Sequence, residues 1–264
     1  MTDATLVDDL AVALTLAAEA DLISLDRYQA QDLEVQLKPD RTQVTDADRR
    51  VERMIVSHLA DARPGDAVLG EEFGAAGESS RQWIIDPIDG TSNFVRGVPI
   101  WGTLLALAID GVPQLGVVSA PALGRRWWGA TGHGAWVKVG AAEPRRLQVS
   151  GVDALGDATL SYNNLQGWDD AGYLEPLVAL SRGVGRTRAF GDLWSYMLLA
   201  EGAIDLAGEF DLKPWDIAAL APVVREAGGR LTSIDGDETI WSPSAFASNG
   251  LLHEKALAAL ASDR

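Results

Sequence analysis

The feature that most constrains the fold is the stretch W-I-I-D-P-I-D-G-T-S-N-F at residues 83–94. Its first three residues are typical of a buried strand, and two aspartates, Asp86 and Asp89, follow at once. A buried carboxylate is costly unless a cation or hydrogen-bond donors lie beside it. Since Pro87 lacks a backbone N–H for a ladder, we expect the strand to end at Asp86. The two side chains and the Ile88 carbonyl can then converge on one point.

Two carboxylates and a carbonyl suit a divalent cation such as Mg²⁺, which prefers oxygen ligands. Gly90 permits close approach of the backbone, and residues 91–94 can open a helix whose first amides bind an anion. A cation beside an anion indicates a phosphate substrate. Two alternatives stay open from this stretch alone. Asp89-Gly90 is also a common hairpin turn, and paired carboxylates also serve glycosidases, although a glycosidase needs no anion site.

Composition narrows the class of protein further. The 264 residues suffice for one large domain or two interlocked ones, and the net charge of −16 argues against a nucleic-acid partner. No apolar run approaches the length of a membrane span, and the acidic start, M-T-D-A-T-L-V-D-D-L, is unlike a secretory signal. The absence of cysteine fits a reducing compartment. We therefore expect a cytoplasmic protein with no membrane partner.

The periodicity of apolar residues changes near residue 150. The first part, 1–149, is expected to be an α+β unit with an antiparallel sheet, and the second part, 150–264, an α/β unit that completes the same site. Helices are predicted at residues 3–30 and 47–60, and strands at 67–72, 81–86, 102–111, 113–121 and 125–131. Asp110-Gly111 predicts a tight hairpin turn. Beyond 150, helices near 170–182, 192–202 and 215–227 are expected to alternate with short strands.

Several motifs share one family resemblance. D-P-I-D-G-T-S-N at 86–93 and P-W-D-I-A-A-L-A-P-V-V-R-E-A-G-G at 214–229 resemble the two signatures of the inositol monophosphatase superfamily of magnesium-dependent phosphomonoesterases. G-E-E at 70–72, V-T-D at 44–46 and G-A-W at 134–136 also match, in the family's order. The resemblance implies a layered α/β/α/β/α sandwich, a homodimer and two or three Mg²⁺ per active site.

The resemblance also implies roles for individual residues. One Mg²⁺ is expected on Glu71, Asp86 and the Ile88 carbonyl, and a second on Asp86, Asp89 and Asp216. Glu71 is further expected to touch a third, weaker ion and, with Thr91 and Asp46, to orient the attacking water. The amides of Gly90 and Thr91 are expected to bind phosphate. Taken without the family, Asp216 is also a candidate N-cap of the helix that begins I-A-A-L.

The residues before Asp216 depart from the inositol pattern. Gly191-Asp192 to Tyr196 resembles the histidinol-phosphatase branch of the superfamily, and Asp192 with Glu209 can pair with an amine and an imidazole. We expect L-histidinol phosphate as the substrate, with Arg188 as a further contact. Asp192 is alternatively an N-cap.

Other esters and another class of function stay open. The alternatives are inositol-1-phosphate and, if basic residues such as Lys38, Arg186 and Arg188 reach the pocket, fructose-1,6-bisphosphate or a 3′-phosphonucleotide. A metal-binding regulator without turnover is disfavoured because every expected ligand is present.

Overall fold

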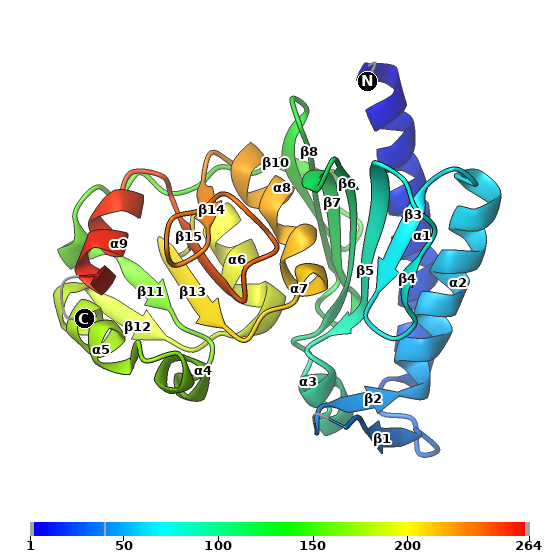
Figure 1. The fold of residues 1–264 in the computed structure, drawn as a ribbon, viewed down its shortest axis with the longest axis horizontal. Helices are drawn as coiled ribbons and strands as arrows, with labels where there is room; N and C mark the ends of the chain where they lie inside the picture. Colours follow the sequence, from blue (N-terminus) through cyan, green and yellow to red (C-terminus); the bar gives the residue numbers. More distant parts are fainter. Residues whose placement is uncertain (1–2, 40, 262–264) are drawn as a thin grey trace.

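Residues 3–39 and 41–261 are described by the computed structural model, which stacks five layers (Figure 1). The outer helices α1 (Asp3–Arg27) and α2 (Asp46–Ala62) cover one face of an eight-stranded sheet. Between this sheet and a second, five-stranded sheet lie α6 (Asp192–Ala200), α7 (Pro214–Ala218) and α8 (Leu220–Glu226). The fifth layer holds α4 (Leu165–Asp170), α5 (Leu174–Gly183) and α9 (His253–Ala261). The expected α/β/α/β/α sandwich is confirmed.

The large sheet has the order β10-β9-β8-β7-β6-β5-β3-β4 and is antiparallel except between β3 and β5. At the β6–β7 turn, Asp110 and Gly111 have φ of 51° and 79°, as the predicted hairpin requires. The strands are β3 (Ala67–Gly70), β4 (Gly74–Ala76), β5 (Arg81–Asp89), β6 (Gly102–Ile109), β7 (Val112–Ala120), β8 (Arg125–Ala130), β9 (Gly134–Val139) and β10 (Arg145–Arg146).

The smaller sheet has the order β12-β11-β13-β15-β14, and β15 runs antiparallel to both of its neighbours. Its strands are β11 (Thr159–Ser161), β12 (Arg186–Arg188), β13 (Leu206–Phe210), β14 (Arg230–Thr232) and β15 (Ser244–Ser248). The sequence did not predict β15. A separate hairpin, β1 (Val35–Leu37) with β2 (Gln43–Thr45), and two short 3₁₀ turns, η1 (Pro121–Leu123) and η2 (Leu155–Asp157), complete the elements.

Three large apolar clusters fill the spaces between the layers. One joins α1 and α2 to the large sheet, one lies between the sheets around α6–α8, and one lies under α4, α5 and α9. The middle helices approach the large sheet closely because glycines face them. A Cβ on Gly116 of β7 would lie 2.0 Å from the Ala219 carbonyl oxygen, at the α7–α8 junction. This close packing holds the start of α7 in a fixed position on the sheet.

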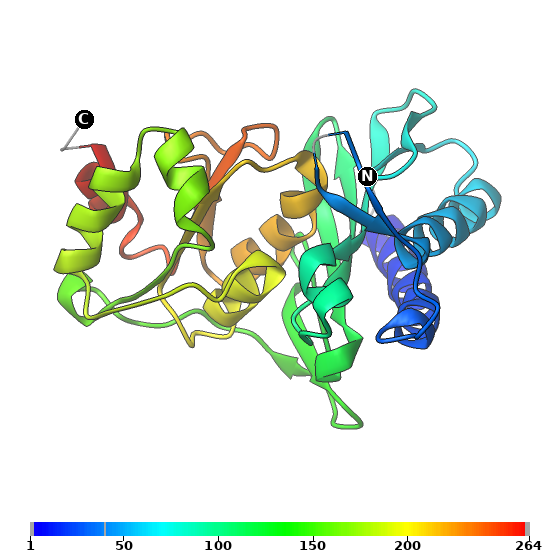
Figure 2. The ribbon, with the colours of Figure 1, turned by 90° about the horizontal axis from the view of Figure 1, so that it is seen from below.

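One predicted helix is divided in two, since that expected at 215–227 is α7 and α8. The helix expected near 170–182 is α5, and α4, which precedes Gly172 at φ 76°, was not predicted. Figure 2 shows the elements of the two sheets on opposite sides of the molecule. The division into units 1–149 and 150–264 stays a prediction. Within the described ranges, no helix is both long and apolar enough to cross a membrane.

Candidate metal and substrate site

A bulge in β5 brings the two motif aspartates together. Asp86 and Asp89 pair with positions two apart on β6, so two residues, Pro87 and Ile88, lie opposite Thr103 alone. The Thr103 hydroxyl donates to the Pro87 carbonyl at 2.9 Å, which satisfies a backbone group that the bulge frees. The expectation that the strand ends at Asp86 is therefore wrong. The strand continues to Asp89, and proline is accommodated because the bulge needs no N–H at that position.

Asp216 joins this pair from the other half of the chain. One carboxylate oxygen from each of Asp86, Asp89 and Asp216 lies within 4.8 Å of the other two. Asp86 is 2% exposed, and its Oδ1 has no hydrogen-bond partner. Burial, followed by the charge of Glu71, raises the pKa of Asp86 well above its usual range, and burial raises the pKa of Asp216 to about 7. Three crowded carboxylates with an unpartnered buried oxygen fit a divalent cation.

The cap predicted for Asp216 differs in detail from the observed contact. Helix α7 begins at Pro214, so Asp216 is its third residue, and its Oδ2 accepts the Lys213 N–H at 2.6 Å. The side chain thus bonds back to the helix start while its carboxylate faces Asp86 and Asp89.

Glu71 lies beside this trio and is paired with a lysine. It follows β3, and its N–H donates to the Ile85 carbonyl of β5 at 3.2 Å. Lys38 Nζ lies 2.8 Å from Glu71 Oε1 and 2.6 Å from Glu72 Oε1. Lys38 is therefore held between two glutamates beside the acidic trio.

Asp48, rather than Asp46, faces Thr91. Thr91 Oγ1 lies 2.9 Å from the Ile88 oxygen and 3.4 Å from Asp48 Oδ1, and Asp48 is fully buried. Burial raises the pKa of Asp48 to about 7. The role predicted for Asp46 needs correction, because its carboxylate is bound elsewhere.

Asp46 belongs to a separate ion-pair group. Its Oδ2 lies 2.9 Å from Arg27 Nε and 3.2 Å from Arg50 Nη2. Thr45 caps α2 by accepting the Ala47 and Asp48 N–H groups. Because the helix starts there, side chains two residues apart point to different sides, and only that of Asp48 turns toward Thr91.

Asp192 lies over the start of α3 (Thr91–Arg96). Asn93 Nδ2 donates to Asp192 Oδ2 at 2.9 Å, and the Leu193 N–H donates to Asp89 Oδ2 at 2.7 Å. The alternative of an N-cap is not supported, since Gly191 occupies that position and Asp192 makes no side-chain cap bond. Burial raises the pKa of Asp192 to about 6.

Glu209 completes an acidic cavity next to the trio. It is 5% exposed on β13, accepts a hydrogen bond from Asn163 Nδ2, and burial raises its pKa to about 8. The cavity measures about 190 Å³. None of the described residues that line it is lysine or arginine; the lining is Asp89, Asn163, Asn164, Asp192, Glu209, Phe210, Asp211, Leu212 and Asp216.

The prediction of Arg188 as a substrate contact does not fit this geometry. Arg188 lies on the edge strand β12, is exposed, and donates from Nη1 to the Thr187 carbonyl. It is absent from the lining of the acidic cavity.

Comparison with known proteins places this site in a family. The model of the inositol monophosphatase family matches residues 6–264. The chain belongs to this family. Proteins named histidinol-phosphatase are 55% identical in Mycobacterium tuberculosis and 51% in Streptomyces coelicolor, covering 96% and 95% of this chain and 98% and 96% of theirs. A solved structure of the extragenic suppressor protein suhB of Bartonella henselae is 30% identical, with a TM-score of 0.89 over 97% of this chain and 100% of that one.

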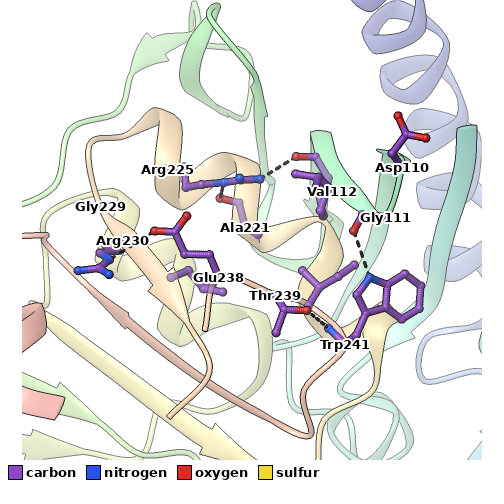
Figure 3. Close-up of a pocket in the computed structure, with 13 residues that line it drawn as sticks. Asp110, Gly111, Val112, Ala221, Arg225, Gly229, Arg230, Glu238, Thr239 and Trp241 are labelled. Atoms are coloured by element: carbon purple, nitrogen blue, oxygen red, sulfur yellow. Dashed lines mark hydrogen bonds and ion pairs between the residues drawn. The ribbon is translucent and has the colours of Figure 1, made fainter. Parts of the chain in front are cut away.

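A larger crevice of this chain lies away from the carboxylates. It measures about 440 Å³ and is bordered by the β6–β7 turn, α8 and the segment before β15 (Figure 3). Here Arg225 Nη2 donates to the Pro113 carbonyl at 2.7 Å, and Trp241 Nε1 donates to the Gly111 carbonyl at 3.1 Å. These bonds fasten the second half to the large sheet, and the crevice contains none of the acidic trio.

Proposed function

We propose that this chain is a magnesium-dependent phosphomonoesterase that hydrolyses L-histidinol phosphate to L-histidinol and phosphate. The observation that carries the proposal is the cavity beside the trio, where Asp192 and Glu209 face the space without a lysine or arginine among the lining residues. Such a cavity favours a leaving group with a positive charge and several N–H donors. Histidinol carries an ammonium group and an imidazole, and the relatives named histidinol-phosphatase support the same substrate.

The same lining argues against the other esters. A second phosphate, as in fructose-1,6-bisphosphate or a 3′-phosphonucleotide, would face Asp192, Glu209 and Asp211 without a basic partner. A neutral ring such as inositol would find hydrogen-bond acceptors but would gain nothing from their charge.

For the metal, we propose Mg²⁺ on Asp86, Asp89 and Asp216, with Glu71 and the Ile88 carbonyl as further ligands. Bound Mg²⁺ supplies activation of water and neutralises charge on the phosphoryl group. Burial, followed by the charges of neighbouring carboxylates, raises the pKa values of Asp86 and Asp216, and this supports the assignment because a bound cation would stabilise their charged forms. The number of ions, two or three, belongs to the proposal as well.

Backbone amides and side chains of the chain are proposed to bind the phosphate and to orient the attacking water. The amides of Gly90, at φ 80°, and Thr91 are proposed to bind the phosphate at the start of α3. The Thr91 hydroxyl and Asp48 are proposed to orient the attacking water and to receive its proton. The water oxygen would bond to phosphorus, the ester P–O bond would break, and the leaving oxygen would take a proton from a solvent water.

Replacing Asp192 by asparagine tests the assignment of the substrate. Asp192→Asn removes the charge and keeps the shape, so we expect KM for L-histidinol phosphate to rise at least about tenfold, or ~1.4 kcal/mol. KM for glycerol 2-phosphate, whose leaving group carries no charge, is expected to change less than about threefold. Equal rises in both constants would refute the assignment.

We further propose that the chain works as a cytoplasmic homodimer. The family resemblance motivates the dimer, and the absence of cysteine and the names of biosynthetic relatives support the location. Sedimentation equilibrium of the purified chain tests the dimer, which a single species of about 28.1 kDa would contradict.

A further inference from the structure

Two asparagines, one from each half of the chain, each donate to one carboxylate of the acidic cavity. Asn93, on α3, donates to Asp192, and Asn163, after β11, donates to Glu209. Neither asparagine has a role in the family resemblance described above. Each amide can therefore fix the position of one carboxyl group of the cavity.

Asn93 has both amide hydrogens committed. Its Nδ2 lies 2.9 Å from the Ile100 carbonyl oxygen and 2.9 Å from Asp192 Oδ2. The first bond fixes the amide plane on the loop that follows α3, and the second fixes one oxygen of Asp192. The carboxyl group of Asp192, a residue that lines the cavity, is therefore held in a defined orientation.

Asn163 provides the equivalent contact for Glu209. Its Nδ2 donates to Glu209 Oε2, and its side chain also lines the cavity. Its backbone has φ 50°, in the left-handed region, which asparagine tolerates better than most residues.

Backbone strain is concentrated around this cavity. Among the described residues, six that are not glycine have positive φ, and three of them, Asn163, Asp192 and Asp211, line it. Such conformations persist where the surrounding structure holds them, and they occur preferentially at functional sites. The strain thus independently indicates that the direction of these side chains matters.

We infer that Asn93 and Asn163 are positioning residues for specificity: each holds one carboxylate so that its free oxygen meets an N–H group of a cationic leaving group. The inference rests on the proposed function and deepens it. An ester with an uncharged leaving group has no positive group to place between Asp192 and Glu209. The amides therefore contribute to the preference for the cationic ester rather than to phosphate cleavage itself.

The test compares two substrates on two variants. Asn163→Gly removes the amide and suits the left-handed backbone, and Asn93→Ala removes the other amide. For each, we expect the ratio of kcat/KM for L-histidinol phosphate to that for glycerol 2-phosphate to fall about tenfold, mostly through KM. If either variant fails to fold, Asn93→Ser or Asn163→Ser replaces it.

Asn249 provides the matched control. It is a buried asparagine outside the cavity lining, and its Nδ2 donates to the Val152 carbonyl at 2.7 Å. Asn249→Ala is expected to lower the thermal midpoint and to keep the substrate ratio within twofold of wild type.

The outcomes separate the two levels of the proposal. If the wild-type enzyme does not prefer the cationic ester, the proposed function fails and this inference falls with it. If the wild type prefers it and both asparagine variants keep that preference within twofold, the inference fails alone. A purely structural role predicts equal losses on both substrates, which also overturns it.

Discussion

Replacing Asp89 by asparagine is expected to stabilise the metal-free protein at about pH 8 and to abolish its stabilisation by Mg²⁺. One oxygen of Asp89 lies within 4.8 Å of carboxylate oxygens of Asp86 and Asp216. Two unit charges at 4.8 Å repel by about 3.5 kcal/mol at an effective dielectric constant of about 20. Because proton uptake relieves part of this repulsion, we expect a gain of ~1–3 kcal/mol in the free energy of unfolding. Asparagine can still accept the Leu193 N–H.

The stability of the metal-free wild type is expected to fall as the pH rises. Burial, then the charges of Asp192 and Asp216, raises the pKa of Asp89 well above its usual range. A carboxyl with a raised folded pKa contributes stability at low pH, and this contribution is lost as pH rises through that pKa. Since the pKa of Asp216 is raised to about 7, the loss extends across neutral pH. The metal-free wild type should therefore lose more stability than the variant between about pH 6 and about pH 8.

Urea unfolding in EDTA, followed by fluorescence of the nine tryptophans, measures this difference. Mg²⁺ at about 100 times its Kd should stabilise the wild type by ~2.7 kcal/mol and Asp89→Asn by much less. Asp170→Asn, which removes one exposed charge from α4, is the control for net charge. A metal-free Asp89→Asn protein less stable than wild type at pH 8, or equal stabilisation of both by Mg²⁺, would refute the reasoning.

Three further predictions use other parts of the fold. Burial lowers the pKa of His253 from 6.5 to about 4, so stability should fall as the pH drops between these values, by at most about 3 kcal/mol; acid unfolding of His253→Asn should lack this loss. Asp48→Asn should lower kcat by about 10²–10⁴, and Asp46→Asn by less than about threefold; steady-state rates giving the reverse order would restore Asp46. Gly116→Ala should cost about 3 kcal/mol in urea unfolding, and an unchanged midpoint would contradict the close packing.

Much of the site was predictable because its ligands lie at the ends of strongly patterned elements. The apolar run 83–85 placed Asp86 and Asp89 at the end of a strand, and the second motif placed Asp216 near a helix start. What the pattern did not reveal was the bulge, since the register of β5 depends on its pairing with β6. The prediction that Pro87 stops the strand considered only the missing N–H.

The position at which α2 begins explains why Asp48, and not Asp46, lies beside Thr91. In V-T-D-A-D, the function of each aspartate depends on where α2 begins. A threonine followed three residues later by an acidic residue is a capping-box pattern. It predicts that the side chain of Asp48 turns back toward the start of the helix. The ion pair of Asp46 with Arg27 involves residues 19 apart on different elements, which no local pattern predicts.

The substrate cavity was only partly predictable, because it is assembled from distant segments. Asp192 and Glu209 were found through the family pattern. Asn93 lies within the quoted motif, but its contact with Asp192, like that of Asn163 with Glu209, is visible only in the structure. Arg188 was expected in the cavity from its charge and its place in the sequence. The side chain lies instead on the edge strand of the smaller sheet. Its nearness to Asp192 in the sequence therefore did not bring it into the cavity.

The most direct test of the central claim is the initial rate of phosphate release by the wild-type protein with Mg²⁺, on L-histidinol phosphate and on inositol-1-phosphate at matched concentrations. We predict a preference of about a hundredfold or more for L-histidinol phosphate, or ~2.7 kcal/mol of transition-state discrimination. Equal rates, or a faster rate on inositol-1-phosphate, would contradict the proposed reading of a cationic leaving group by Asp192 and Glu209.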